Sequence, residues 1–284
     1  MDFNDTPSEA AYRAKARAWL DANADRKTTK KDSLPAQSLT EALERARTWQ
    51  RTKAEGGFAC ITWPKEYGGQ GGSSLDNVVY SQEESNYLVP GGFYAIGLGM
   101  CLPTVLAWGT DAHKERYVAP AVRGDEIWCQ LFSEPAGGSD VAGLRTRAEK
   151  DGDEWVINGQ KVWTSGAHYC DYGIVVVRTD PNVPKHKGLT MFIIDMKAPG
   201  VEVRPIKQMS GESEFNEVFF TDVRIPDSDR LGEPGQGWKV AITTLMNERL
   251  AVGGGGGADW EELLGLAQEA EMEKTLATAN SAVR

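Results

Sequence analysis

The residues best suited to chemistry stand late in the sequence, where Glu248-Arg249 interrupts an apolar run and the glycines 253–257 follow closely. A carboxylate among apolar side chains is a candidate general base. On an exposed helix face the same carboxylate would form i,i+4 pairs or cap the helix, and the glycines would form a flexible linker. The residue types alone leave both interpretations open.

Two other segments have residues suited to holding a ligand. Residues 131–143 read LFSEPAGGSDVAG, and such small residues let backbone N–H groups approach a flat or anionic ligand. A surface turn explains the same composition. Residues 157–168 read INGQKVWTSGAH, in which an aromatic and two hydroxyls follow an Asn158-Gly159 turn and suit stacking and hydrogen bonding to a ring. A hairpin with a core tryptophan is the alternative.

Several kinds of site have no signal in this sequence. It contains no GxGxxG between a strand and a helix, no GxxxxGK[ST] and no GxSxG, so we expect no Rossmann site, P-loop or serine-hydrolase elbow. The histidines, His113, His168 and His186, lack metal-ligand spacing, so we expect no metal site. A net charge of -10 argues against nucleic acid or an anionic membrane as the main partner.

The cysteines and the chain's hydropathy bear on its compartment. Cys60, Cys101, Cys129 and Cys170 form no CxxC pair and lie in apolar or aromatic surroundings, so we expect them to be reduced and mostly buried. The N-terminal segment lacks the apolar core of a signal peptide, and no stretch is apolar enough over sufficient length to span a bilayer. These features predict a cytoplasmic protein.

The elements that must position the candidate residues follow a helix, strand, helix order. Helical spacing of apolar residues predicts helices over 7–24, 38–55, 75–88 and 111–123, and again over 236–251 and 258–279. Between them, from 127 to 225, short apolar or alternating runs are separated by Gly, Pro, Asp and Asn, which is typical of an antiparallel sandwich or barrel. The predicted class is therefore an α+β multidomain fold.

Taken together, five segments resemble the acyl-CoA dehydrogenase family in order and spacing: WPKEYGGQGGS (63–73), FSEPAGGSDVAGLRT (132–146), INGQKVWTSGA (157–167), EVFFTDVRIP (217–226) and GQGWKVA (235–241). The resemblance implies an N-terminal helical domain over 1–124, a middle β-barrel or sandwich over 125–232 and the start of a C-terminal helical bundle over 233–284. It also implies FAD between the β-domain and the C-terminal helices, bound without a Rossmann fingerprint.

The resemblance also implies particular site residues. Those expected at the flavin are Phe132, Ser133, Gly138, Trp163, Thr164 and Ser165, and those expected at the substrate are Ser139 and Arg249. Ser133 stands where the family often has threonine and keeps the hydroxyl, and Ser165 is a better match than Thr164 for a hydrogen bond to flavin N5. The apolar run 91–103 is expected to line the acyl pocket.

The opening carboxylate acquires a role from the same resemblance. In a subset similar to isovaleryl-CoA and long-chain acyl-CoA dehydrogenases, the base that removes the α-proton is the Glu of a Glu-Arg pair on the first helix after the β-domain. Asn247-Glu248-Arg249-Leu250 matches that subset, so Glu248 is the implied base. In this register the glycines 253–257 lie inside that helix as a packing surface.

The implied reaction is FAD-dependent α,β-dehydrogenation of an acyl-CoA thioester to the trans-2-enoyl-CoA, with electron-transferring flavoprotein as acceptor, in a homo- or hetero-oligomer. Acyl-CoA oxidases and flavin monooxygenases share the scaffold. By this register only about two of the four bundle helices are present, so we expect a truncated chain that binds FAD weakly and turns over poorly alone. The alternative is a catalytically incompetent fragment or a structural subunit of a heteromeric acyl-CoA dehydrogenase.

Overall fold

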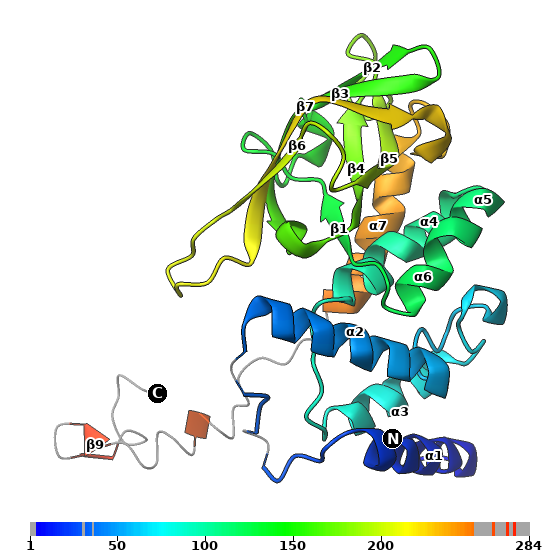
Figure 1. The fold of residues 1–284 in the computed structure, drawn as a ribbon, viewed down its shortest axis with the longest axis vertical. Coiled ribbons are helices and arrows are strands. Elements are labelled where there is room, and N and C mark those ends of the chain that lie inside the picture. The colour runs from blue at the N-terminus through cyan, green and yellow to red at the C-terminus, as the bar shows by residue number, and fades with distance from the viewer. Residues whose placement is uncertain are drawn as a thin grey trace.

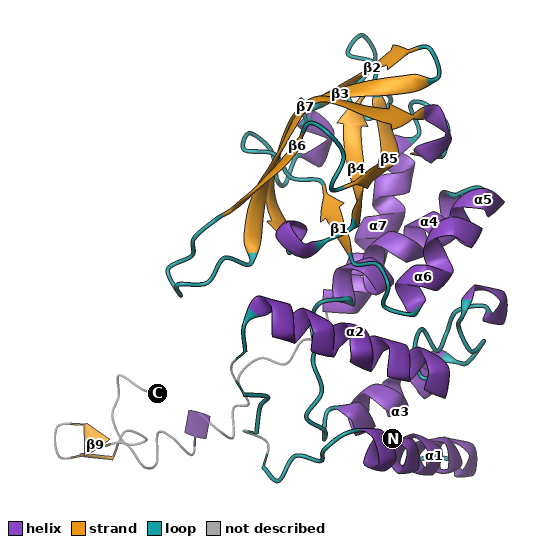
Figure 2. Ribbon diagram, viewed as in Figure 1, coloured by secondary structure: helices purple, strands orange, loops and turns teal. Residues whose placement is uncertain are grey.

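The computed structural model describes residues 4–29, 32–35, 37–252, 263–264, 271–272 and 275–276. Helices α1–α3 lie at one end of the molecule and a β-domain lies at the other, with α4–α6 and the long helix α7 between them (Figure 1). Figure 2 shows the same division by secondary structure. The predicted α+β class and its helix, strand, helix order are confirmed.

The helices begin and end where the local sequence supplies caps. Thr6, Ser38 and Ser73 each form a capping box with an acidic residue three positions later, which satisfies backbone N–H groups that a helix start leaves unpaired. Gly57, in the left-handed region at φ 76°, ends the second helix. The α-helices are α1 (Pro7–Asn23), α2 (Leu39–Gly56), α3 (Ser74–Glu84), α4 (Leu102–Trp108), α5 (Asp111–His113), α6 (Ala119–Val122) and α7 (Gly237–Val252), with π-helical turns at Gly97–Cys101 and Lys114–Val118.

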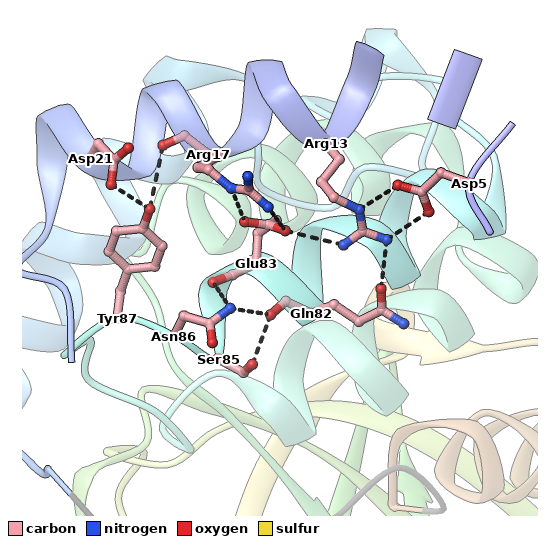
Figure 3. A network of polar contacts seen from close by, with 9 residues as sticks. All are labelled: Asp5, Arg13, Arg17, Asp21, Gln82, Glu83, Ser85, Asn86 and Tyr87. Atoms are coloured by element: carbon pink, nitrogen blue, oxygen red, sulfur yellow. Dashed lines mark hydrogen bonds and ion pairs between the residues drawn. The ribbon is translucent and has the colours of Figure 1, made fainter. Parts of the chain in front are cut away.

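A buried carboxylate joins α1 to α3 (Figure 3). Glu83 accepts hydrogen bonds from Arg17 at 2.9 and 3.0 Å and from Arg13 at 3.1 Å. The Arg17 hydrogen bond, followed by that of Arg13, lowers the pKa of Glu83 although burial opposes it. Nearby, the Tyr87 hydroxyl donates to Asp21 at 2.6 Å. These contacts hold together the helices that frame the N-terminal end of the molecule.

The β-domain is a twisted sheet in the order β6-β7-β3-β2-β4-β5-β8, with β1 added beside β4. Pairing is antiparallel except for β1 with β4 and a single parallel pair between β2 and β4. One core lies within this domain, and another lies between the sheet, α4–α6 and α7. The strands are β1 (Trp128–Leu131), β2 (Arg147–Asp151), β3 (Glu154–Ser165), β4 (Tyr172–Arg178), β5 (Leu189–Asp195), β6 (Val201–Pro205), β7 (Phe215–Pro226) and β8 (Arg230–Leu231).

The predicted Asn158-Gly159 turn is wrong, because both residues lie within the continuous strand β3. The Asn158 side chain pairs with Asp222 on β7, donating to its carboxylate and accepting from its N–H, both at 3.0 Å. Gly159, at φ 149°, takes up a register shift between the strands. An added Cβ there would lie 2.6 Å from the Thr146 hydroxyl oxygen. Close approach of Thr146, rather than a reversal of the chain, therefore explains the glycine.

Helix α7 returns from the β-domain and packs against β5, α4 and the π-helical turn Gly97–Cys101. Its Thr244 hydroxyl meets that of Thr104 on α4 at 2.8 Å, and Trp108 donates to the Thr243 hydroxyl at 2.9 Å. The glycines 253–257 lie outside the described residues. Of the helix predicted over 258–279, residues 263–264 are helical, and the prediction is wrong at β9 (Glu271–Met272) and β10 (Thr275–Leu276), which form an antiparallel pair. The other residues of that range lie outside the described residues.

Three further expectations concern single residue types and hydropathy. All four cysteines are free, and three of them are buried, as predicted. No described helix is long and apolar enough to cross a bilayer. Within the described part of the chain, no three His, Cys, Asp or Glu side chains gather closely enough to hold a metal ion.

Candidate functional site

The Gly-rich loop that follows β1 is anchored by an ion pair which sequence reasoning missed. The Lys161 ammonium on β3 is fully buried and lies 2.8 Å from Glu134 Oε1 and 3.1 Å from the Phe132 carbonyl oxygen. Glu134 also accepts hydrogen bonds from the backbone N–H groups of Arg145 at 2.6 Å and Thr146 at 3.0 Å. One carboxylate therefore holds both ends of the loop 132–146 against β3.

Burial and mutual attraction act in opposite directions on the pKa values of this pair. Burial lowers the pKa of Lys161 to about 8, and the Glu134 carboxylate offsets part of that effect. Burial also raises the pKa of Glu134, but Lys161 and the backbone donors outweigh it, so that its pKa lies below the ordinary value. The pair is thus a fixed internal support for the loop.

The next residues along β3 present an aromatic ring to solvent. Trp163 is 59% exposed although it lies between buried neighbours, and its backbone is left-handed at φ 60°. A register shift with β7 falls between Lys161 and Thr164 and turns the ring outward, where Phe215 meets it edge-on. Left-handed backbone at an aromatic residue is strained, and such strain is concentrated at functional sites. This bulge is therefore a strong candidate for ligand contact.

The hydroxyls of the predicted site have different surroundings. Among the described residues, the buried Thr164 hydroxyl oxygen has no hydrogen-bond partner. Ser165 lines a cavity of 610 Å³ together with Phe93, His168 and Phe215, the ring that meets Trp163. Ser133 is half-buried, and its carbonyl accepts from Val162 N–H at 2.9 Å. An orphaned buried hydroxyl is uncommon in folded proteins, so Thr164 has capacity to bond a ligand.

The loop tip carries the remaining predicted residues of this segment. Phe132 is buried beneath the loop, while Gly138 and Ser139 are exposed. A Cβ added at Gly138 would meet nothing within 4 Å, so the space beside it is open. Lys185 fixes the adjacent Asp140 by bonds of 2.8 and 2.9 Å. The structure thus brings Phe132, Ser133, Trp163 and Thr164 to one region and leaves Gly138 and Ser139 at the open tip.

The candidate base lies across from β1. Glu248, half-buried on α7, accepts a hydrogen bond from the Gln130 side-chain amide at 3.2 Å. Gln130 stands two residues before Phe132, so this bond places the carboxylate beside the strand that enters the Gly-rich loop. The Gln130 amide oxygen is buried and has no partner among the residues that the structure describes. Gln130 is a second site residue that sequence reasoning missed.

Arg249 points elsewhere. Its guanidinium contacts the Met246 sulfur at 3.7 Å, and both side chains are exposed. Among the described residues the structure shows no contact of Arg249 with Ser139 or Glu248. Its predicted role at the substrate stays a prediction.

A cavity of 580 Å³ lies under this region. Its walls include Ala95, Leu98 and Pro103 from the apolar run predicted to line an acyl pocket. It reaches α7 at Asn247, the residue before Glu248. A carboxylate on α7, a cavity with apolar and polar walls and an exposed aromatic ring on a strained strand are features that suit a flat cofactor and an acyl substrate.

Comparison with known proteins identifies the class. Residues 6–125 match the family model described as "Acyl-CoA dehydrogenase, N-terminal domain", and residues 129–223 match that described as "Acyl-CoA dehydrogenase, middle domain". Because these matches cover most of the chain, the protein belongs to the acyl-CoA dehydrogenase family. Members of this family are FAD-dependent oxidoreductases.

Individual relatives agree with this assignment. The chain is 41% identical over 240 residues to acyl-CoA dehydrogenase IpdE1 of Mycobacterium tuberculosis, covering 84% of this chain and 62% of that one. A solved structure titled "Tcur3481-Tcur3483 steroid ACAD" matches with a TM-score of 0.75 at 32% identity, over 95% of this chain and 69% of that one. The ChsE4-ChsE5 complex of M. tuberculosis matches with a TM-score of 0.73 at 29% identity, covering 99% of this chain and 71% of that one. The chain thus spans less than two thirds of the length of IpdE1.

Proposed function

We propose that this chain carries out the FAD-dependent α,β-dehydrogenation of an acyl-CoA thioester, giving the trans-2-enoyl-CoA. The observation that carries the proposal is the Gln130–Glu248 hydrogen bond at 3.2 Å, which joins residues 118 positions apart. This contact joins a carboxylate on α7 to the strand that enters the Gly-rich loop, the segment that resembles the family's flavin loop. Family membership supplies the reaction class, and this contact supplies the candidate base.

The residues present fit a flavin. Trp163 offers a ring face, and in the described part of the chain Thr164 offers a buried hydroxyl without a partner and the space beside Gly138 is open. With Phe132, Ser133 and Ser165 these residues would hold FAD. When bound, FAD supplies the acceptor for the hydride that leaves the substrate β-carbon.

The chain's own residues would act on the α-proton. The α-C–H of a thioester is a weak acid, so the base must be held close to it and shielded from water. Glu248 takes the α-proton, and the Gln130 amide orients the carboxylate from the β1 side. The acyl group enters the cavity beneath, displaces its water and packs against the 95–103 segment. Electron-transferring flavoprotein is the proposed final acceptor, in the cytoplasm.

Substitution of the base tests the proposal. Turnover is measured as enoyl-CoA formed from acyl-CoA, with FAD and an artificial electron acceptor. Loss of a general base lowers the rate about 100- to 10,000-fold, so Glu248→Gln should lose nearly all turnover. Glu217→Gln is the matched control, since Glu217 is also half-buried and also accepts from a glutamine, Gln160, at 2.8 Å. Equal turnover in the Glu248→Gln variant and the unsubstituted chain would refute the assignment.

A second candidate function is that of a structural subunit in a heteromeric dehydrogenase. Two of the matched structures are titled as pairs of named proteins. On α7, Ile242 and Met246 are exposed at 40% and 53% and would suit a partner's helices. The same Glu248→Gln change, assayed in the reconstituted complex, separates the candidates, because a structural subunit would keep full activity without this carboxylate.

A further inference from the structure

The 580 Å³ cavity beneath Asn247 is not uniformly apolar. Phe58, Ile61 and Leu98 give it hydrocarbon walls. Toward α2 and α3 it is lined instead by Lys53 and Glu84, which also line an adjoining cavity of 280 Å³. The cavity therefore offers an acyl group both apolar walls and a charged pair.

Glu84 and Lys53, the charged residues that line the cavity, differ in how many partners they have. Glu84 Oε1 accepts from the Trp49 indole and from the Tyr80 hydroxyl, each at 3.1 Å, and lies 3.4 Å from the Lys53 ammonium. An ammonium has three N–H donors, and Lys53 makes only this one contact within the described part of the chain. Its side chain is 20% exposed and lines both cavities, so a molecule bound there can reach the donors that Glu84 leaves free.

A ligand that binds in the cavity must accept a hydrogen bond from the Lys53 ammonium in place of the water it displaces. A hydrocarbon end would strip water from Lys53 and offer no hydrogen bond in return, which is unfavourable. An oxygen acceptor at the same place would replace the lost water. Glu84 would stay paired through Trp49 and Tyr80, so binding would not leave its carboxylate alone.

From this geometry we infer that the acyl group accepted by this chain carries an oxygen function remote from its thioester, a carboxylate, keto or hydroxyl group that accepts a hydrogen bond from Lys53. The inference rests on the proposed function, since it identifies the cavity as the acyl site. It assigns Lys53 the choice between oxygenated and plain alkyl acyl groups.

The test is binding of defined CoA thioesters to the whole chain in the presence of FAD, measured by calorimetry. Octanoyl-CoA is compared with octanedioyl-CoA and ω-hydroxyoctanoyl-CoA, and the decanoyl series repeats the comparison at greater length. A hydrogen bond to a charged group corresponds to roughly ten- to hundredfold in affinity, so the oxygenated thioesters should bind at least about tenfold more tightly. The dioyl and hydroxy arms show whether a charged or a neutral oxygen is preferred.

Substitution of Lys53 makes the test specific. Lys53→Met should abolish the preference and tighten octanoyl-CoA binding, because no ammonium is then desolvated, and Lys53→Arg should keep the preference for the dioyl thioester. Lys114→Met is the matched control, since Lys114 is 21% exposed, lies 3.3 Å from Asp111 and lines none of these cavities. That control should keep the preference unchanged.

The outcomes separate the two proposals. If octanoyl-CoA binds and turns over as well as its oxygenated counterparts, the inference about Lys53 is wrong and the proposed function stands. The inference is also wrong if Lys53→Met keeps the preference, or if Lys114→Met loses it equally. If no CoA thioester binds at all, the proposed function fails and the inference fails with it.

Discussion

Replacement of Lys161 by methionine tests how the Gly-rich loop is held. The change keeps most of the side-chain volume and removes the ammonium that bonds Glu134 at 2.8 Å and the Phe132 carbonyl at 3.1 Å. Breaking a buried pair costs about 3–5 kcal/mol, because one charge is left uncompensated. Glu134 keeps its two backbone donors, Arg145 and Thr146. We therefore expect Lys161→Met to lower the free energy of unfolding by about 3 kcal/mol, at the low end of that range.

The assay is denaturant and thermal unfolding of the whole chain. For a protein of this size about 3 kcal/mol corresponds to a fall in melting temperature of roughly 6–12 °C. In the Glu134→Gln background, Lys161→Met should cost at least about 1 kcal/mol less, since the uncompensated charge is gone. FAD affinity should fall with Lys161→Met as well, because the loop 132–146 loses its anchor.

An exposed ion pair in the same loop gives the matched control. Lys185 lies 2.8 Å from Asp140, the same distance as in the buried pair, but its side chain is 49% exposed against 0% for Lys161. Exposed pairs contribute about 0–1 kcal/mol, so Lys185→Met should be nearly neutral. If Lys161→Met and Lys185→Met destabilise the protein equally, burial does not increase the contribution of the Lys161–Glu134 pair to stability, and the reasoning is refuted.

Three other predictions follow from the structure. Because the pKa of Glu83 is lowered, this carboxylate contributes fully to stability above pH 4.5, and the contribution is lost as the pH falls below that value. The free energy of unfolding, measured over a pH series, should therefore fall less steeply with acid in Glu83→Gln than in the unsubstituted chain. An unchanged slope contradicts the prediction. Gly159→Ala should lower the free energy of unfolding by about 1–3 kcal/mol, because the added Cβ would lie 2.6 Å from the Thr146 hydroxyl oxygen. Gly91→Ala is the control, because a Cβ there meets no described atom within 4 Å, and its change in the same unfolding assay should be near zero. Trp163→Ala should change stability by less than about 1 kcal/mol, since the ring is exposed, but weaken FAD binding about tenfold in a fluorescence titration; unchanged affinity would remove the ring from the flavin site.

Most helix starts and most strands could be predicted because their signals are local, although the helix α4, which begins at the end of the apolar run 91–103, was not predicted. The capping boxes at Ser38 and Ser73 lie within single turns, and the alternating or apolar runs of the β-domain mark strands without reference to a partner. Asn158-Gly159 shows the limit of such signals. The dipeptide favours a turn, yet cross-strand bonds to Asp222 hold it in β3, and this partner lies 64 residues further along the chain.

The candidate site divides in the same way. The residues proposed to contact ligands, such as Trp163 and Glu248, stood out by type and by family resemblance, whereas Gln130 and Lys161 did not. Gln130 reaches Glu248 across 118 positions, and Lys161 reaches Glu134 across 27. A lone glutamine or lysine in a strand carries no sign of its partner, because the pairing depends on which elements pack together. Most of the elements, and the resemblance of the loop to the family's flavin segment, can be read from the sequence alone. The tertiary structure decided which carboxylate is buried, which is oriented and which charge faces the cavity, since burial and distance exist only once the chain has folded.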